Sequence, residues 1–315
     1  MKNALLKSFG LCATLCVVLL FACKVNAQAT TGSLTGQVTD SSGAVIPNVA
    51  VTAIEINKGV EFRGRTNAVG EYTISNVIPG MFKVTASASG FETGIVLNAN
   101  LEIDQKLLLN FSLKPGAAST TVVVTSAPSM LQTQSSETGA VMETEDILDL
   151  PLFGRNFYDL TALVPGVVIA SGGINSLNLS VSGQREYANS VELDGVESTQ
   201  NRTQDITVVP SVDSVQEFKV VTSAFNAEFG NASGGVIAIQ TKSGNNKFHG
   251  DVYEFFRPNF TAARPYSFGG GPEPASVLKQ HNFGGTVGGP IKKDRSFFFV
   301  SYEGSRQKNA YTYLD

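Results

Sequence analysis

Residues 212–244 of this 315-residue chain read VDSVQEFKVVTSAFNAEFGNASGGVIAIQTKSG, and this stretch decides the fold. A Val-containing segment with an acidic residue, 215–220, precedes the pair Phe229-Gly230 and a loop of small residues. A second apolar segment follows Gly234 and Gly235. Glycine permits tight turns and close approach of two backbones. The stretch therefore predicts two strands joined through a glycine-rich turn inside a packed domain.

The same stretch closely resembles the plug domain of TonB-dependent outer-membrane receptors, with Phe229 where that family usually has Tyr. Upstream, residues 149–156 (DLPLFGRN) resemble the receptor subfamily that carries an N-terminal regulatory-like sandwich. The resemblance implies an α+β plug over residues 117–245, with Gly230, Gly234 and Gly235 as its turn glycines. An ordinary α/β domain with a glycine-rich turn is the alternative. A phosphate-binding loop is excluded, because no Gly-x-x-x-x-Gly-Lys-Ser/Thr string occurs.

Local signals in the same region predict two short helices and a strand with a turn. Residues 143–150 form the first helix, which ends before Pro151 because proline disfavours helical geometry at the preceding residue. Asn156 is a suitable cap for a second helix that runs to Pro165-Gly166. Residues 191–196 read as a strand and a turn. The acids of the first helix are assigned to solvent rather than to catalysis: Glu143, Glu145, Asp146 and Asp149.

Residues 28–116 alternate apolar and polar side chains in short runs, with turn signals about every ten residues. Such period-2 runs predict an all-β sandwich. The expected inward rows include Leu34 and Val38, residues 49–53, residues 82–86, and residues 107–113.

This segment resembles a carboxypeptidase regulatory-like domain, through GQVTD at 36–40, PNVAV at 47–51, TNAVGEYTI at 66–74 and PGMFKV at 79–84. The resemblance implies the fold of this segment, and the name of the family implies no peptidase activity. It implies a structural spacer or docking module. A sugar-binding module is the alternative.

Residues 246–315 contain strand candidates at 248–257, 282–289 and 298–303, and residues 292–295 form a charged turn between the last two. Apolar-out, polar-in strands separated by turns are the signature of membrane β-barrels. The segment has room for about three or four strands, whereas a barrel that holds a plug must be wide, and the resemblance to TonB-dependent receptors implies about twenty-two strands. We therefore expect a truncated antiparallel transmembrane barrel, and hence an N-terminal fragment of a longer receptor. A soluble hairpin is the alternative.

Residues 1–27 have the three-part layout of a secretory signal peptide, with Lys2 and Lys7, an apolar run and a small-residue site. Cleavage is expected between Ala27 and Gln28. An uncleaved anchor, or a lipoprotein signal at Cys23, is the alternative. All three cysteines lie in this segment, so we expect no disulfide and no thiolate metal site in the mature chain.

The composition excludes several classes of function. The chain carries 23 basic and 27 acidic residues, and removal of the three lysines before residue 28 leaves a net charge of −7. A mildly acidic chain with no long Lys/Arg run argues against nucleic-acid binding. No hydrolase or zinc motif appears, and His249 and His281 stand far apart. We therefore expect no enzyme activity, no cofactor and no metal.

The resemblance implies a receptor of the bacterial outer membrane, with the sandwich in the periplasm, that binds an extracellular ligand and imports it by energy-coupled plug rearrangement. Its partners would be a TonB-type energy-transducing protein, outer-membrane lipid and an unidentified ligand. The family's transducer contact is a short apolar-Thr-Val strand, and the nearest match is Val122, Val123, Val124 and Thr125. These residues could equally be the first strand of the plug. Two rival functions are a surface adhesion or carbohydrate-binding protein that uses the sandwich, and a signalling receptor.

Overall fold

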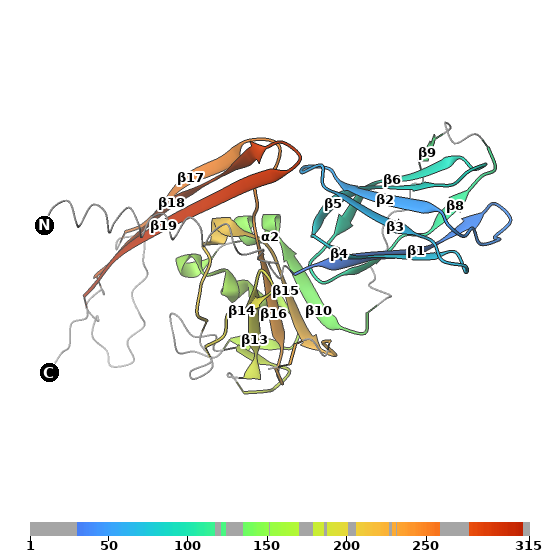
Figure 1. Cartoon of the computed structure of the whole chain (residues 1–315). Helices are drawn as coiled ribbons and strands as arrows, with labels where there is room; N and C mark the ends of the chain where they lie inside the picture. Colours follow the sequence, from blue (N-terminus) through green and yellow to red (C-terminus); the bar gives the residue numbers. More distant parts are fainter. Residues whose placement is uncertain are drawn as a thin grey trace, which may run out of the picture.

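The computed structural model describes residues 30–116, 121–123, 135–150, 152–169, 179–185, 188–200, 206–226, 229–230, 232–258 and 277–310. The described chain is mainly β, as predicted, and forms a sandwich, a central domain and a terminal sheet in that order (Figure 1). No helix in this described part is long and apolar enough to cross a membrane. The expected cleavage site, Ala27 and Gln28, lies outside the described residues.

The sandwich consists of two sheets. The first has the order β4-β1-β7, with β8 also pairing with β1, and the second has the order β3-β2-β5-β6-β9. The strands are β1 (Gly32–Asp40), β2 (Ala50–Glu55), β3 (Glu61–Arg65), β4 (Glu71–Val77), β5 (Gly80–Ser87), β6 (Thr93–Leu101), β7 (Lys106–Leu108), β8 (Phe111–Leu113) and β9 (Thr121–Val123).

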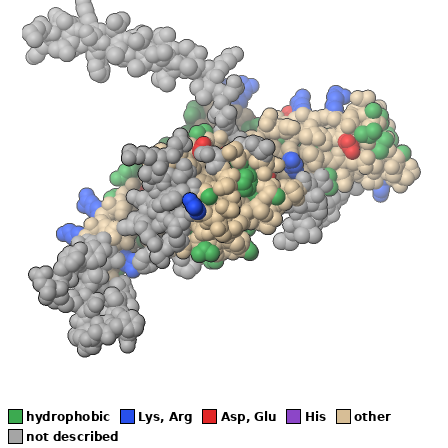
Figure 2. Space-filling view, turned by 90° about the horizontal axis from the view of Figure 1, so that it is seen from below, with side chains coloured by type: hydrophobic (Ala, Val, Ile, Leu, Met, Phe, Trp, Pro, Cys, Tyr) green, Lys and Arg blue, Asp and Glu red, His purple; other side chains and the backbone are tan. Residues whose placement is uncertain are grey.

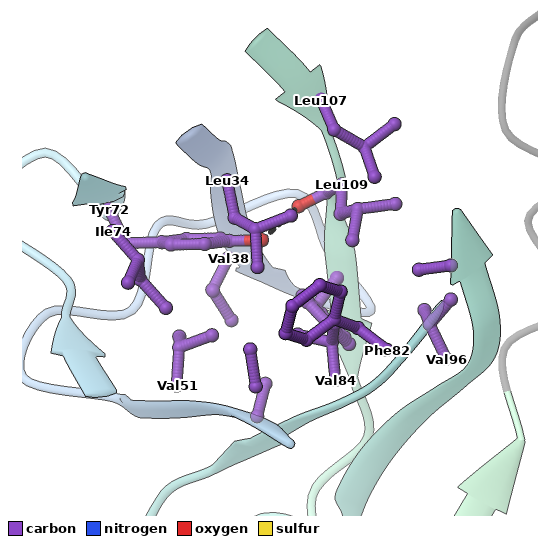
Figure 3. Close-up of a cluster of buried hydrophobic side chains, with 14 of the residues drawn as sticks. Leu34, Val38, Val51, Tyr72, Ile74, Phe82, Val84, Val96, Leu107 and Leu109 are labelled. Atoms are coloured by element: carbon purple, nitrogen blue, oxygen red, sulfur yellow. Dashed lines mark hydrogen bonds between the residues drawn. The ribbon is translucent and has the colours of Figure 1, made fainter. Parts of the chain in front are cut away.

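The core between these sheets is built from the predicted inward rows (Figure 3). Leu34, Phe82 and Val84 are fully buried, while Leu108, which alternates with the buried row, is exposed. Each such fully buried side chain stabilises the fold by about 1.5–3 kcal/mol. The Tyr72 hydroxyl donates a hydrogen bond of 2.8 Å to the Leu109 carbonyl, as Figure 3 shows. A Cβ at Gly36 would lie 1.9 Å from that same carbonyl oxygen, so only glycine fits there.

The short strand β9 belongs to the sandwich. It pairs in parallel with β6, where Gly94 lies opposite Val122 and Ile95 opposite Val123. In the described structure, Val122 and Val123 therefore pair with the sandwich and not with the central sheet. The chain pairs with the edge strand β6 as it leaves the sandwich. Sequence periodicity predicts a short strand but cannot show which sheet edge the strand joins.

The central domain contains a sheet of order β10-β15-β16-β13-β14 and a separate pair, β11-β12. Its strands are β10 (Thr138–Glu143), β11 (Val167–Ile169), β12 (Leu179–Val181), β13 (Ser190–Leu193), β14 (Val196–Glu197), β15 (Val215–Ser223) and β16 (Val236–Thr241). Its helices are α2 (Thr144–Asp149) and the 3-10 helices η1 (Phe153–Arg155), η2 (Phe157–Leu163) and η4 (Val212–Ser214). The two strands expected at 215–220 and 234–239 are β15 and β16, which pair antiparallel.

The central core lies where α2 and η2 cover one face of β15 and β16. Phe157 of η2 packs on Phe218 of β15, with ring centroids 5.6 Å apart. The cap prediction is confirmed, because the Asn156 side chain accepts a hydrogen bond of 3.2 Å from the Tyr158 amide. The capped segment is a 3-10 helix of seven residues, which is longer than the three or four residues usual for this form. The turn between β13 and β14 uses Asp194 and Gly195, both at positive φ, as a tight antiparallel turn requires.

The terminal sheet has the order β17-β18-β19 and is antiparallel throughout. Its strands are β17 (His249–Arg257), β18 (Val277–Lys292) and β19 (Ser296–Ala310). The predicted charged turn is the short connection, residues 293–295, between β18 and β19. The connection between β17 and β18 spans residues 258–276 and is much longer.

Candidate functional site

One face of the terminal sheet carries exposed apolar side chains over most of its area and points away from the rest of the described chain. Val252, Gly285 and Tyr302 share a row across the three strands, and Val287 and Val300 share the neighbouring row. Val252 is 93% exposed and Tyr302 is 64% exposed. A soluble sheet buries this kind of face, so an exposed one indicates an apolar environment outside the protein. Further exposed apolar side chains on this face are Phe248 and Phe256.

The opposite face is polar and turns toward the central domain. Tyr253 on β17 donates a hydrogen bond of 3.0 Å from its hydroxyl to Glu303 on β19. Thr286 on β18 donates to Asp251 on β17. The Ser301 hydroxyl lies 2.8 Å from the Ser211 hydroxyl of the central domain. The terminal sheet thus joins a polar inner face to an apolar outer face.

Arg155 links the central domain to this inner face. Its guanidinium forms an ion pair with Asp213 at η4 and lies 4.6 Å from the ring centre of Tyr253 and 4.1 Å from that of Phe255. Gly154 and Arg155 both have positive φ, at 74° and 57°, and this turn directs the chain after Leu152 toward η2. A planar guanidinium can pair with a carboxylate and stack on aromatic rings at the same time, and lysine cannot.

The charges at this contact are largely removed from water. The side chains of Arg155 and Asp213 are 12% and 10% exposed, so each compensates the other. Burial lowers the pKa of nearby Lys242, while Asp213 and Asp251 act in the opposite direction. No group of three or more His, Cys, Asp or Glu residues in the described ranges is placed to hold a metal ion. The arrangement holds the central domain against the terminal sheet through an ion pair, ring contacts and a hydroxyl contact.

The predicted turn glycines lie at the β15–β16 end of the central sheet, and their surroundings differ. A Cβ at Gly235 would lie 2.7 Å from the Val181 side chain and 2.9 Å from the Val221 carbonyl. A Cβ at Gly234 would lie 2.5 Å from the Asn189 side chain. Gly230 has no described atom within 4 Å of that position and no positive φ. Close approach therefore requires glycine at 234 and 235, while nothing in the described surroundings requires it at 230.

The residues proposed to contact the energy transducer are only partly described. The backbone of Val122 and Val123 lies in β9 on the sandwich, while Val124 and Thr125 lie outside the described residues. The two histidines do not meet: His281 lies 3.2 Å from Glu254 on the outer face of the terminal sheet, and His249 contacts the Lys247 carbonyl at 3.1 Å.

Sequence reasoning did not single out the Arg155, Asp213 and Tyr253 contact. Arg155 entered only as one letter of a motif, and Asp213 only as the start of the deciding stretch.

Three family models match the chain in succession. A carboxypeptidase regulatory-like domain matches residues 33–114, a TonB-dependent receptor plug domain matches residues 131–236, and an outer membrane beta barrel domain matches residues 240–315. A TonB-dependent transporter, Oar of Myxococcus xanthus, is 28% identical over 311 residues, which cover 93% of this chain and 28% of that protein. The chain therefore spans little more than a quarter of the length of this relative.

Two solved structures also align with part of the chain. The siderophore receptor PirA from Acinetobacter baumannii has 23% identity over 54% of this chain and 24% of its own, with a TM-score of 0.38. The P. aeruginosa receptor FpvA, solved with bound pyoverdine, has 16% identity over 54% of this chain and 20% of its own, with a TM-score of 0.35.

The order of the three matched domains agrees with the geometry, because the plug match covers a domain that contacts the polar face of the matched barrel strands. The chain thus carries, in this order, segments that match a regulatory-like domain, a TonB-dependent receptor plug and an outer membrane barrel domain, and it is similar over most of its length to the first part of a TonB-dependent transporter.

Proposed function

We propose that this chain is part of a TonB-dependent importer of the outer membrane, in which the central domain is the plug and the terminal sheet is barrel wall. The observation that carries the proposal is the two-faced terminal sheet, whose polar side contacts the plug through Arg155 while its apolar side is exposed. Membrane barrels have this distribution, with lipid on the outside and polar groups on the inside.

The same proposal divides the chain into a signal peptide (1–27), a sandwich (28–116), a plug (117–245) and barrel strands (246–315). It gives the protein an extracellular ligand, lipid around the barrel and a TonB-type partner that moves the plug by energy coupling, and it includes no enzymatic step, cofactor or nucleic acid. On the face seen in Figure 2, the described Lys and Arg side chains stand apart from one another, unlike the basic stripe of a nucleic-acid-binding protein.

The periplasmic placement of the sandwich is supported by the connections of the terminal sheet. Barrels have short turns on the periplasmic side and longer loops outside. The sandwich lies at the short turn, where the Asn246 amide donates a hydrogen bond of 3.1 Å to the Asn57 carbonyl. Asn246 also exchanges hydrogen bonds of 2.7 and 2.9 Å with Asp294 of that turn.

No observation favours the carbohydrate-binding alternative. Sugars are commonly held against exposed aromatic faces, and within residues 30–116 each aromatic side chain is buried or packed against the core. The rings concerned are Phe62, Tyr72, Phe82, Phe91 and Phe111.

The test uses the full receptor that contains this chain, purified from outer membranes, and the periplasmic domain of a TonB-type protein from the same cell. We expect the two to bind, and we expect deletion of residues 122–125 to abolish binding. Deletion of residues 128–131, just downstream, is the matched control and should leave binding intact. Failure of the unaltered receptor to bind would contradict the proposed function, whereas binding by the 122–125 deletion would contradict only the assignment of that segment.

A further inference from the structure

The central strand β15 is buried on both faces, although the core covers only one of them. Successive residues of a strand point to opposite faces. Phe218 and Val220 point into the core, so Glu217 and Lys219 point to the other side of the sheet. Both are buried, at 7% and 3% exposure. Charged side chains are seldom buried unless they have partners, so something specific must cover this face.

The cover is the turn between β6 and β7 of the sandwich, residues 102–105. The Ile103 amide donates a hydrogen bond of 2.8 Å to Glu217, and Ile103 itself is fully buried. Lys219 donates to both the carbonyl and the carboxylate of Asp104, each at 3.3 Å. One turn therefore holds two alternating charges of the same strand.

Hydrogen bonds within the sandwich hold this turn in shape. Asp104 has a φ of 52°, which lets its carbonyl and its carboxylate point the same way. The Glu102 amide donates a hydrogen bond of 2.9 Å to the Gln105 side chain, which closes the turn within the sandwich. A closed turn loses little conformational freedom when it docks. Beside it, the Asn100 side chain donates to Glu143 at the end of β10, at 3.3 Å. Figure 1 shows this end of the sandwich against β10 and β15.

The contact is also built so that it can open. Lys219 has a second acidic partner, Glu137, at 2.7 Å within the central domain. If the sandwich leaves, Lys219 remains paired, and Glu217 gains water in place of one amide. Neither domain is left with an uncompensated buried charge, which is the usual large cost of breaking such a contact.

We propose that the β6–β7 turn is a latch by which the sandwich holds plug strand β15 at rest, so that the plug sheet opens only after the sandwich separates from it. This inference rests on the proposed function, because a latch has a role only if the plug moves. Its tests need neither ligand nor energy transducer, so they can fail or succeed independently of transducer binding.

The first experiment tests docking in the full receptor in its membrane. The expected mature chain has no cysteine, so Asn100→Cys and Glu143→Cys would supply the only thiols of this part of the receptor. We expect a short bis-maleimide to join them in most molecules. The matched control is Lys114→Cys with Glu143→Cys, because Lys114 follows β8 at the opposite end of the sandwich. Equal joining of both pairs, or of neither, would overturn the proposal.

The second experiment tests release by hydrogen–deuterium exchange of residues 138–143 and 215–223. Asp104→Asn keeps a residue that tolerates positive φ and removes the charge that faces Lys219. We expect this variant to raise the exchange rate at least fivefold. Lys106→Gln, two residues away and exposed, should leave the rate unchanged.

The joined Asn100→Cys/Glu143→Cys receptor provides the converse arm. It should exchange at least fivefold more slowly over the same residues than the same variant whose thiols are capped singly. If joining and single capping give the same rate, plug opening does not require separation and the latch is refuted.

Discussion

At the scale of single residues, Arg155 combines an unfavourable backbone conformation with contacts to two domains. It occupies a left-handed backbone conformation, pairs with Asp213 and stacks on two aromatic rings of β17. The backbone of a non-glycine residue at positive φ is unfavourable and needs compensation. The compensation here comes from the contacts of Arg155 with the rings of β17. The unfavourable backbone conformation of Arg155 therefore persists only while the plug contacts the barrel strands.

We predict that Arg155→Met lowers the free energy of opening of the plug by about 3–5 kcal/mol, because Asp213 is left as an uncompensated, largely buried charge. Hydrogen–deuterium exchange at residues 157–163 and 212–214 would measure the change. The double variant Arg155→Met/Asp213→Leu removes both charges and should lose less stability than the single one. A double variant that is less stable than Arg155→Met would show that the charge pair is not the source of the effect.

The glycines of the deciding stretch give a matched comparison at the same scale. Gly235→Ala forces a Cβ to within 2.9 Å of the Val221 carbonyl, whereas Gly230→Ala meets open space among the described residues. We predict that Gly235→Ala destabilises the plug by about 1–3 kcal/mol, the usual cost of overpacking, and that Gly230→Ala is tolerated. The urea concentration at which residues 135–241 become protease-sensitive in the membrane-inserted receptor would report both. Equal sensitivity of the two variants would contradict the close packing at 235.

At the scale of elements, β15 connects the three domains. One face forms the plug core, the other face holds the sandwich, and its N-terminal neighbour η4 carries the Asp213 that pairs with Arg155. A movement of this strand would therefore change both the contact with the sandwich and the contact of Asp213 with Arg155. Its two-sided burial also explains why its sequence reads as nearly continuous apolar and charged residues rather than as a clean alternation.

The pH dependence of docking follows from Glu217. Burial is the main cause that raises the pKa of this carboxyl, the hydrogen bond from the Ile103 amide lowers it, and Glu102 and Glu143 raise it, so that the pKa stands at about 7. Lys219 lies on the same face. The docked state therefore binds the proton more tightly than the separated state. Docking is strongest below the ordinary glutamate pKa of about 4.5 and weakens as the pH rises through about 7.

We predict that exchange of residues 102–105 in the full receptor, corrected for its intrinsic pH dependence, accelerates between pH 5 and pH 8. Glu217→Gln keeps an oxygen that can accept from the Ile103 amide and removes the titration, so its corrected rate should be flat. An accelerating rate in Glu217→Gln would assign the dependence to another group.

Sequence patterns predicted elements where the cause is local. Leu34, Phe82 and Val84 follow the period of a strand and lie in the core, and Asn156 caps the segment that begins at its own position. The contacts of Arg155 with Tyr253, and of Ile103 with Glu217, join residues about a hundred positions apart that share no period. Such pairs depend on how finished domains dock, and the sequence carries no local sign of it.

At the scale of the whole molecule, the positions of the three domains define a direction across the membrane. The short β18–β19 turn, the plug-to-barrel connection at Asn246 and the sandwich turn at Asn57 all lie together. A Cβ at Gly59 would lie only 2.6 Å from the Asp294 side chain, so the sandwich approaches this turn closely. The long connection of β17 and β18 belongs to the opposite end of the sheet. The sandwich and the short turn should therefore face the same compartment.

We predict that Lys293→Cys in the turn and Ser42→Cys in the sandwich resist a membrane-impermeant maleimide in intact cells and react once the outer membrane is permeabilised. Ser267→Cys, in the long connection, should react in intact cells. The cysteine-free mature receptor is the control for background labelling. Short turns face the periplasm in outer-membrane barrels, and the sandwich is held to this turn by hydrogen bonds, so both thiols are expected to be shielded together. Labelling of Ser42→Cys in intact cells while Lys293→Cys stays protected would separate the sandwich from the turn and contradict the docked arrangement.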